Sequence, residues 1–445
     1  MAQTYFIATL GCPKNEVDSA KLSGRLERAG YVPVGQPNDA DLVVVNTCAF
    51  IEPAREESVE TILELSSLRQ PGARLAVTGC LAERSGPELA AALPEVDIVA
   101  GFGVEFLDCV VPAPSAPGVG SVSPVHFRKR SQVPSFDLLE LPRPPARSPW
   151  AYVKVAEGCD RKCGFCAIPS FRGRQRSRNL ESILEEVESL QASEIVLVAQ
   201  DLASFGRDVS ARREVSKRSD DADIVALVEA VAARVPRVRL LYLYPSSLTD
   251  RLVDTVVATG VPYFDLSLQH VSPPLLRRMR RWGSGRKFLE RIERIRSVAP
   301  EAALRSSFIL GYPGETEEDQ DALLAFIEEA SLDWAGFFLF SKEDGTYAAD
   351  LGDQVPTELA LERLSECAEL QGEITAAKRR GVVGSVVSVL VDRPGVGRSF
   401  REAPEIDGIV RLPSRHPSGS VVDVKVTAAE GTDLIASTVR TTAAS

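Results

Sequence analysis

The chain has 445 residues, 44% hydrophobic and 25% charged, which is ordinary for globular proteins and enough for two or three domains. No apolar run approaches the roughly 20 residues that a transmembrane helix needs, and the first residues do not read as a secretory signal, so we expect a cytoplasmic protein. The 51 basic and 62 acidic residues give a net charge of −11, which argues against general attraction to nucleic acid and suits a basic protein partner.

Residues 1–110 alternate short apolar runs with helical patterns, which predicts βαβ units and a parallel sheet. The expected strands are Tyr5–Thr9, Leu42–Asn46, Leu75–Thr78 and Val96–Ala100, and the expected helices are Asn15–Ala29, Pro53–Leu68 and Pro87–Leu93. A cysteine follows each of the first three strands: Cys12, Cys48 and Cys80. Because the carboxyl ends of parallel strands share one edge, these thiols are expected to converge.

Each of these cysteines taken alone is equally well explained as a small buried hydrophobic residue, which is what a free cysteine usually is. Three thiols at the same end of three strands, without a nearby histidine, instead suggest an iron–sulfur cluster with one open iron. Downstream, residues 111–149 form a predicted linker, because nine prolines between Pro112 and Pro149 prevent regular helix or central strand. The basic run HFRKRS within it is expected to be a solvated patch.

Residues 150–378 predict a second β/α domain. Its strand-like runs are Ala151–Ala156, Ile195–Ala199, Val238–Tyr244, Tyr263–Leu268, Leu304–Leu310 and Gly336–Phe340, with helical patterns between them. Six repeats indicate a partial (β/α)6 barrel, whose active site would lie at the carboxyl ends of the strands. Residues 207–223 are polar and of mixed charge and are expected to be a surface insertion.

The densest motif is Cys159-x3-Cys163-x2-Cys166, directly after the first of these strands. Three thiols on one loop can hold a metal centre from three sides, and iron–sulfur clusters usually take four thiolates, so one iron would stay open. Zinc is the competing interpretation, but a structural zinc site is closed by four ligands, and the nearest histidine, His126, is far upstream. The motif, including the aromatic Phe165, resembles that of radical S-adenosylmethionine (SAM) enzymes.

The last part of the chain predicts a long helix over Thr357–Arg380 and then, in residues 379–445, short β runs broken by Gly and Pro, typical of a small β-barrel. Cys367 falls on the apolar face of the helix, and Cys109 lies in an apolar run. Both are expected to be core residues.

The whole chain resembles the radical SAM methylthiotransferases, whose terminal barrel is a TRAM-like domain. The resemblance rests on the words TLGCPKNEVDS, VNTCAFIEPAREES, VTGCLAER, EGCDRKCGFCAIPSFRGRQRSR, LLYLYP, SLQH and FILGYPGETEED. GCPKN and FREAPEIDG favour the branch that modifies an aspartate of ribosomal protein twelve of the small subunit. The alternative branch modifies a tRNA adenosine and more often carries GCQMN.

The resemblance implies two [4Fe-4S] clusters. The one on Cys159, Cys163 and Cys166 would bind and reduce SAM, and the resulting 5′-deoxyadenosyl radical would take hydrogen from the aspartate β-carbon. The one on Cys12, Cys48 and Cys80 would deliver a methylated sulfur, and a reductant such as flavodoxin or ferredoxin would supply electrons. Further SAM contacts are expected from Phe165, Gln200, Arg305, Ile309, Gly311 and Gly314, although both glycines could equally form a tight turn.

Two alternatives remain at this point. An electron-transfer or redox-sensing iron–sulfur protein would explain the clusters but not the six-repeat barrel. A tRNA substrate would need a basic surface, yet residues 381–445 carry seven basic and seven acidic side chains. The basic run Arg172, Arg174, Arg176 and Arg178 is as compatible with a solvated face as with carboxylate recognition.

Overall fold

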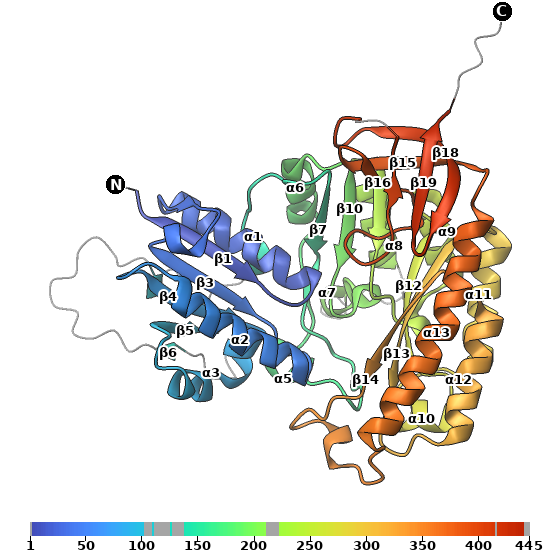
Figure 1. Ribbon diagram of the computed structural model, residues 1–445, viewed down its shortest axis with the longest axis horizontal. Helices are drawn as coiled ribbons and strands as arrows, with labels where there is room; N and C mark the ends of the chain where they lie inside the picture. Colours follow the sequence, from blue (N-terminus) through green and yellow to red (C-terminus); the bar gives the residue numbers. More distant parts are fainter. Residues whose placement is uncertain are drawn as a thin grey trace, which may run out of the picture.

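We describe the chain from a computed structural model covering residues 2–101, 109–110, 125–126, 138–210, 222–413 and 416–439. An N-terminal sheet domain, a central barrel of parallel strands and a small C-terminal barrel follow one another (Figure 1). The expected α/β fold class with a terminal β-barrel is therefore confirmed. Most of the Pro-rich segment, including most of HFRKRS, and most of the charged insertion lie outside the described residues. None of the described helices is both long and apolar enough to span a membrane.

The N-terminal domain is a parallel sheet in the order β2-β1-β3-β4-β5-β6. Its strands are β1 (Thr4–Thr9), β2 (Val32–Pro33), β3 (Leu42–Thr47), β4 (Arg74–Gly79), β5 (Ile98–Ala100) and β6 (Val125–His126). Its helices are α1 (Pro13–Arg28), η1 (Pro37–Asp39), α2 (Glu52–Leu68) and α3 (Cys80–Ala92). Helix α1 packs on one face of the sheet, and α2 and α3 pack on the other. Every residue of β3 is buried, as expected for a strand covered on both faces.

One helix begins earlier than expected. The segment expected at Pro87–Leu93 belongs to α3, which starts at Cys80. Pro87 lies inside α3, and Ser85 leaves helical geometry at a kink (φ −137°, ψ 32°). Proline is compatible with the first turn of a helical segment, so the sequence shows the second segment more clearly than the first. Cys80 consequently occupies a helix N-terminus instead of a loop.

The central domain is a partial barrel of six parallel strands. They form the sheets β11-β10-β7 and β12-β13-β14, which meet at the bridge between Leu243 and Leu266. The strands are β7 (Trp150–Lys154), β10 (Glu194–Val198), β11 (Arg237–Leu240), β12 (Tyr263–Gln269), β13 (Ala303–Leu310) and β14 (Trp334–Leu339). The strand expected at Val238–Tyr244 ends at Leu240, because Tyr242 has a left-handed backbone (φ 64°).

Helices cover the outside of this barrel (Figure 1). They are α6 (Leu180–Leu190), α7 (Arg207–Ser210), α8 (Ala222–Ala232), α9 (Asp250–Ala258), α10 (Pro273–Arg278), α11 (Gly285–Val298), α12 (Glu317–Ala330) and α13 (Thr357–Gly381). Short elements complete it: η2 (Leu138–Glu140), β8 (Ala156–Glu157), α5 (Ile168–Arg172), β9 (Arg176–Ser177), η3 (Leu202–Ser204), η4 (Pro245–Ser247) and η5 (Tyr347–Asp350). In the described sheets β7 and β14 are not paired with each other, and α1 of the N-terminal domain packs beside β7.

The C-terminal domain is a closed barrel in the order β15-β16-β17-β19-β18. Its strands are β15 (Val386–Arg393), β16 (Val396–Arg398), β17 (Val410–Arg411), β18 (Val421–Glu430) and β19 (Asp433–Thr438). The segment between β16 and β17 leaves the barrel, and Ala403 and Ile406 pack among Tyr152, Tyr263 and Trp334 of the central strands. Sequence patterns did not predict β16, because it is only three residues long.

Candidate active site

The three N-terminal cysteines lie at one edge of the first sheet. Cys12 is the N-cap of α1, Cys48 directly follows β3, and Cys80 is the first residue of α3. Their sulfur atoms are close enough to interact electrostatically with one another. Gly11 makes this possible: it has a left-handed backbone (φ 91°), and a Cβ there would lie 2.7 Å from Cys48 Sγ. Two helix N-termini therefore face this trio, which favours bound thiolates.

The second trio occupies the loop between β8 and α5. Cys159, Cys163 and Cys166 interact electrostatically, and the Cys166 N–H donates to the Cys163 carbonyl (3.2 Å). Two backbone hydrogen bonds of 2.8 Å fix the loop, from Gly164 N to Met279 O and from Ala348 N to Gly164 O. These bonds tie the cysteine loop to the segments at Met279 and Ala348.

The donor chemistry of the two trios fits iron–sulfur clusters, because each trio offers three free thiols. Burial raises the pKa of Cys48 and Cys166 to about 12 and that of Cys159 to about 11, so cations must bind to stabilise thiolates. One zinc ion would draw its sulfurs to about 2.3 Å from itself, whereas a cluster spreads its ligands over several irons.

A cation stands next to each trio. Arg172 donates through Nη2 to Cys80 Sγ (3.0 Å), and Arg281 donates through Nη1 to Cys163 Sγ (3.3 Å). The Arg161 backbone N–H lies 3.4 Å from Cys159 Sγ. The guanidinium groups of Arg161 and Arg281 both lie over the ring of Tyr244, 3.9 and 4.3 Å from its centroid. Hydrogen bonds to ligand sulfurs are one of the ways in which proteins set cluster potentials.

A buried ionic network links the two trios. Arg172 Nη1 contacts Glu157 (3.0 Å) and Asp18 (3.2 Å), and Lys154 contacts the same two carboxylates. Glu157 ends β8, just before Cys159, whereas Arg172 reaches Cys80. Burial raises the pKa of Glu157, but Arg172 and Lys154 together outweigh burial and hold this pKa well below its usual range. The edge of one domain is thereby fixed against the edge of the other.

Lys14 points from α1 into the barrel. Its Nζ lies 3.5 Å from the ring centroid of Tyr242, which follows β11 and donates its backbone N–H to Asp265 of β12 (3.0 Å). Among the described residues, Lys14 has no hydrogen bond or ion pair besides this ring contact. Burial lowers its pKa, with nearby Cys12 acting in the opposite direction. The motif GCPKN contains this residue, but no local pattern indicates where its side chain points.

Of the residues expected to contact SAM, two pack against the apolar core and two are polar side chains paired within the protein. Ile309 is half-buried on the same face of β13 as Arg305, and Phe165 packs against the main core. Gln200 donates through Nε2 to Glu157 (2.7 Å), and Arg305 lies 3.4 Å from both Asp265 and Asp407. These polar side chains already have partners within the protein.

Gly311 and Gly314 form the turn after β13, with φ of 73° and 80°. The Gly311 N–H donates to the carboxylate of Glu315 (2.9 Å), and Glu315 is paired with Arg363 of α13 (3.0 Å). The tight-turn interpretation therefore has a direct structural basis, because both glycines adopt a conformation that other residues avoid.

The basic run after the second trio is not uniform. Arg172 and Arg178 are buried, and Arg178 pairs with Glu186 (2.6 Å), whereas the Arg174 side chain is 90% exposed. A solvated face describes only part of this run, and buried internal ion pairs account for the rest. Cys367 lies in the main core, and Cys109 packs against the core beneath α1.

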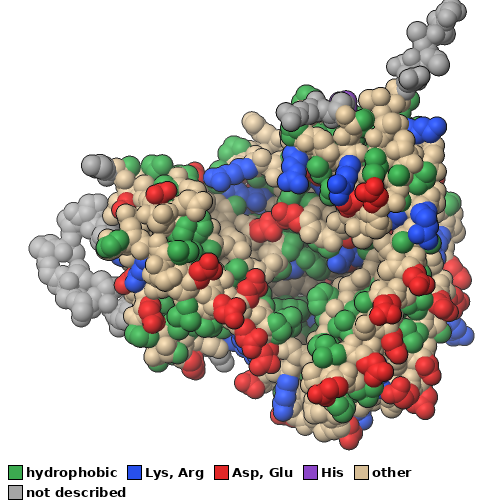
Figure 2. All heavy atoms as spheres, in the orientation of Figure 1, with side chains coloured by type: hydrophobic (Ala, Val, Ile, Leu, Met, Phe, Trp, Pro, Cys, Tyr) green, Lys and Arg blue, Asp and Glu red, His purple; other side chains and the backbone are tan. Residues whose placement is uncertain are grey.

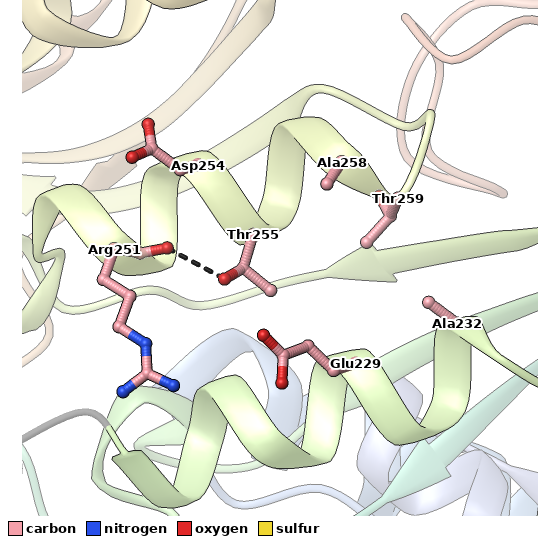
Figure 3. A pocket seen from close by; sticks show the side chains of 7 residues that line it. All are labelled: Glu229, Ala232, Arg251, Asp254, Thr255, Ala258 and Thr259. Carbon is pink, nitrogen blue, oxygen red and sulfur yellow. Dashed lines mark hydrogen bonds between the residues drawn. The ribbon is translucent and has the colours of Figure 1, made fainter.

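Two surface pockets lie outside the trios. One, of about 560 Å³, lies between α8 and α9 and is lined by Glu229, Arg251, Asp254 and neighbouring small residues (Figure 3). The other, of about 230 Å³, adjoins the cysteine loop at Asp160, Arg161 and Asp201. Figure 2 also shows a hollow between the N-terminal domain and the central barrel. The cysteine-bearing edge of the first sheet faces the barrel across this junction, because α1 packs beside β7.

Three protein families match the N-terminal, central and C-terminal parts of the chain separately. The uncharacterized protein family UPF0004 matches residues 4–101, the radical SAM superfamily residues 153–327 and the TRAM domain residues 383–439. The ribosomal protein uS12 methylthiotransferase RimO of Moorella thermoacetica is 42% identical over 442 residues, 95% of this chain and 96% of the relative. The protein of the same name from Desulforudis audaxviator is 41% identical over 449 residues, 97% and 96% of the two chains. A solved structure of the cobalamin-dependent S-adenosylmethionine radical enzyme OxsB matches with a TM-score of 0.47 and 14% identity, over 84% of this chain and 56% of that one.

Proposed function

Because the chain belongs to the RimO family of radical SAM methylthiotransferases, we propose that it transfers a methylthio group to the β-carbon of an aspartate in ribosomal protein uS12. The observation that carries this proposal is the pair of thiol trios, joined by the network around Arg172 and Glu157. A radical SAM enzyme with a single cluster would need only the trio of Cys159, Cys163 and Cys166. A second trio at the facing sheet edge supplies a place for sulfur.

Each trio has its own task in this proposal. Cys159, Cys163 and Cys166 hold the cluster that binds SAM, and Cys12, Cys48 and Cys80 hold a second [4Fe-4S] cluster. When bound, these groups supply the radical chemistry that replaces a C–H bond by a C–S bond, which acids and bases of the protein could not do. We place the enzyme in the cytoplasm, with a flavodoxin or ferredoxin as reductant.

The chain's own side chains position these groups and exclude water. Arg281 and Arg172 direct hydrogen bonds to one sulfur of each trio. The barrel floor is sealed by Tyr263 and Trp334 together with Ala403 from the C-terminal domain. A sealed floor confines reactive species to the mouth of the barrel, where substrate enters.

The charge distribution supports a protein substrate. Helix α2, which follows Cys48, exposes only carboxylates among its charged side chains that point to solvent: Glu52, Glu56, Glu57, Glu60 and Glu64. In Figure 2 acidic side chains gather on the N-terminal domain beside the hollow. Ribosomal proteins are typically basic, so this surface would attract them and repel the phosphates of tRNA.

Mass spectrometry of ribosomal proteins and tRNA, from cells with and without this gene, tests the proposal. We expect uS12 to lose the mass of one methylthio group on deletion and tRNA nucleosides to stay unchanged. Loss of methylthioadenosine from tRNA with unmodified uS12 in both strains would reverse the assignment. Release of 5′-deoxyadenosine by the reduced, reconstituted protein separates an enzyme from an electron carrier.

A further inference from the structure

Lys14 differs from the other cations near it and near the second trio. Lys154 contacts Asp18 and Glu157, and Arg305 contacts Asp265 and Asp407. Arg172, Arg161 and Arg281 are likewise engaged with carboxylate, hydroxyl, carbonyl or sulfur acceptors. Within the described part of the chain, the ammonium of Lys14 contacts only the face of the Tyr242 ring.

The carboxylates near Lys14 already have other partners, and binding Lys14 would require them to give up those contacts. Asp265 accepts the Tyr242 backbone N–H through one oxygen and lies 3.4 Å from Arg305 through the other. Glu157 is held by Arg172, Lys154 and Gln200. Lys14 is partly accessible, and the neighbouring carboxylates Asp265 and Glu157 are engaged with other groups. Its N–H donors are therefore free to bind an added anion.

The position of Lys14 indicates which anion. It lies two residues after Cys12, at the N-terminus of α1, and its Nζ reaches Tyr242 on the barrel side. An anion bound there would sit between the proposed sulfur-donating trio and the barrel. An aspartate that must meet both brings its own carboxylate, one bond away from the β-carbon that reacts.

We propose that Lys14 binds the carboxylate of the target aspartate and so sets the position of its β-carbon; this inference rests on the proposed function. The face of Tyr242 holds the ammonium by a cation–π contact and leaves its N–H donors free for the substrate. A charge-assisted hydrogen bond of about 2.8 Å then fixes the carboxylate. Lys14 acts as a specificity residue, because an asparagine or another uncharged side chain would leave its charge unpaired.

The test uses two fluorescent peptides with the uS12 sequence around the target residue, one with the aspartate and one with asparagine in its place. Binding to the reconstituted full-length protein is measured by fluorescence anisotropy, without reductant, so that no turnover occurs. We expect wild type to bind the aspartate peptide about 10- to 100-fold more tightly than the asparagine peptide. Lys14→Met, which keeps an unbranched side chain one atom shorter and removes the charge, should abolish this difference and leave binding of the asparagine peptide unaffected.

Controls separate this role from a structural one. Lys14→Arg should retain most of the preference. Lys287→Met should retain all of it, since Lys287 also lies over an aromatic ring, that of Trp282, but at an exposed position of α11. Iron content and SAM affinity should be unchanged in Lys14→Met. Equal binding of both peptides by wild type, an unchanged preference in Lys14→Met, or loss of iron or SAM affinity in that variant would each overturn the inference.

The two proposals can fail separately. If wild type binds the aspartate peptide through Lys14 but never modifies it under reducing conditions, the proposed function fails and the binding inference stands. If the peptide is modified at equal rates and with equal KM by wild type and Lys14→Met, the function stands and the inference fails.

Discussion

At the scale of single residues, the sulfur atoms of the two trios have different surroundings. Cys80 receives a hydrogen bond from the buried Arg172, which also binds two carboxylates. Cys163 receives one from Arg281, whose other nitrogen reaches a backbone carbonyl. Each trio has its own thiols and its own donor, so the ligand sets of the two proposed clusters are independent, although the network around Arg172 and Glu157 joins them.

The first prediction follows from this independence. Cys159→Ala should abolish SAM cleavage, because two remaining thiolates cannot hold the cluster in place. Changing Cys12, Cys48 and Cys80 together to Ala should leave SAM cleavage detectable and stop sulfur transfer. Iron content should fall by about half in either variant, since each trio would hold one cluster of four irons. Iron analysis and chromatography of 5′-deoxyadenosine measure both effects, and unchanged iron in the triple variant would rule out a second cluster.

A second prediction concerns Cys367, whose fully buried side chain lies 3.6 Å from Gln320 Nε2. Cys367→Ser puts a hydroxyl into the main core and should lower the free energy of unfolding by about 1–3 kcal/mol. Iron content should not change. Cys109→Ser, at a half-buried position, should cost less. Urea denaturation measures the stability, and a loss of iron in Cys367→Ser would show instead that this thiol is a ligand.

At the scale of elements, the turn after β13 is shaped by its contact with α13. Gly311 has a left-handed backbone, and a Cβ there would lie 2.7 Å from Ala360 Cβ on that helix. The Gly311 N–H is held by Glu315, which Arg363 of the same helix binds. The conformation of the turn and the position of the helix are therefore coupled.

The third prediction compares two glycines. Gly260 has nearly the same φ as Gly311, 75° against 73°, but an added Cβ at Gly260 meets nothing within 4 Å. Gly260→Ala should cost only the left-handed backbone, about 1 kcal/mol. Gly311→Ala should cost about 1–3 kcal/mol more, because overlap with Ala360 forces a shift. Urea unfolding of both variants provides the measurement. Equal losses would mean that α13 does not constrain the turn.

Elements were predictable where a short-range pattern encodes them. The parallel strands and their cysteines follow from alternating apolar runs and helices, and the closed terminal barrel from Gly- and Pro-broken β runs. The start of α3 was not predictable, because Pro87 and the kink at Ser85 conceal its first segment. The network around Lys154 was not predictable either, because its partner Asp18 is 136 residues away and no local pattern connects the two residues.

At the scale of the whole molecule, buried ion pairs connect all three domains. Glu194 of β10 binds Arg239 of β11 (2.8 Å) and Arg398 of the C-terminal barrel (3.0 Å). Burial raises the pKa of Glu194, but the surrounding arginines outweigh it and hold the pKa at about 2. On the other side of the barrel, α1 meets the segment that the C-terminal domain inserts, where Glu16 shares a hydrogen bond with Glu405.

The contact between Glu16 and Glu405 should make stability depend on pH. Burial and the neighbouring Glu405 raise the pKa of Glu16 from 4.5 to about 7, and Arg143 only partly offsets them. The folded protein therefore binds this proton more tightly than the unfolded chain does. The resulting stabilisation is complete below about pH 4.5 and is lost as the pH rises through about 7, where two carboxylates would face each other.

Glu16→Gln keeps a donor for Glu405 but cannot ionise, so it should flatten this part of the pH profile. We expect the difference in Tm between Glu16→Gln and wild type to grow in favour of the variant from pH 5 to pH 8, because only wild type loses its proton there. Differences against wild type remove the contributions of other groups, such as Asp407, whose pKa burial raises to about 6. Glu60→Gln, on the exposed face of α2, is the matched control and should follow wild type throughout. Calorimetry across this range decides the matter: parallel profiles of wild type and Glu16→Gln would show that the contact between α1 and the C-terminal segment does not titrate.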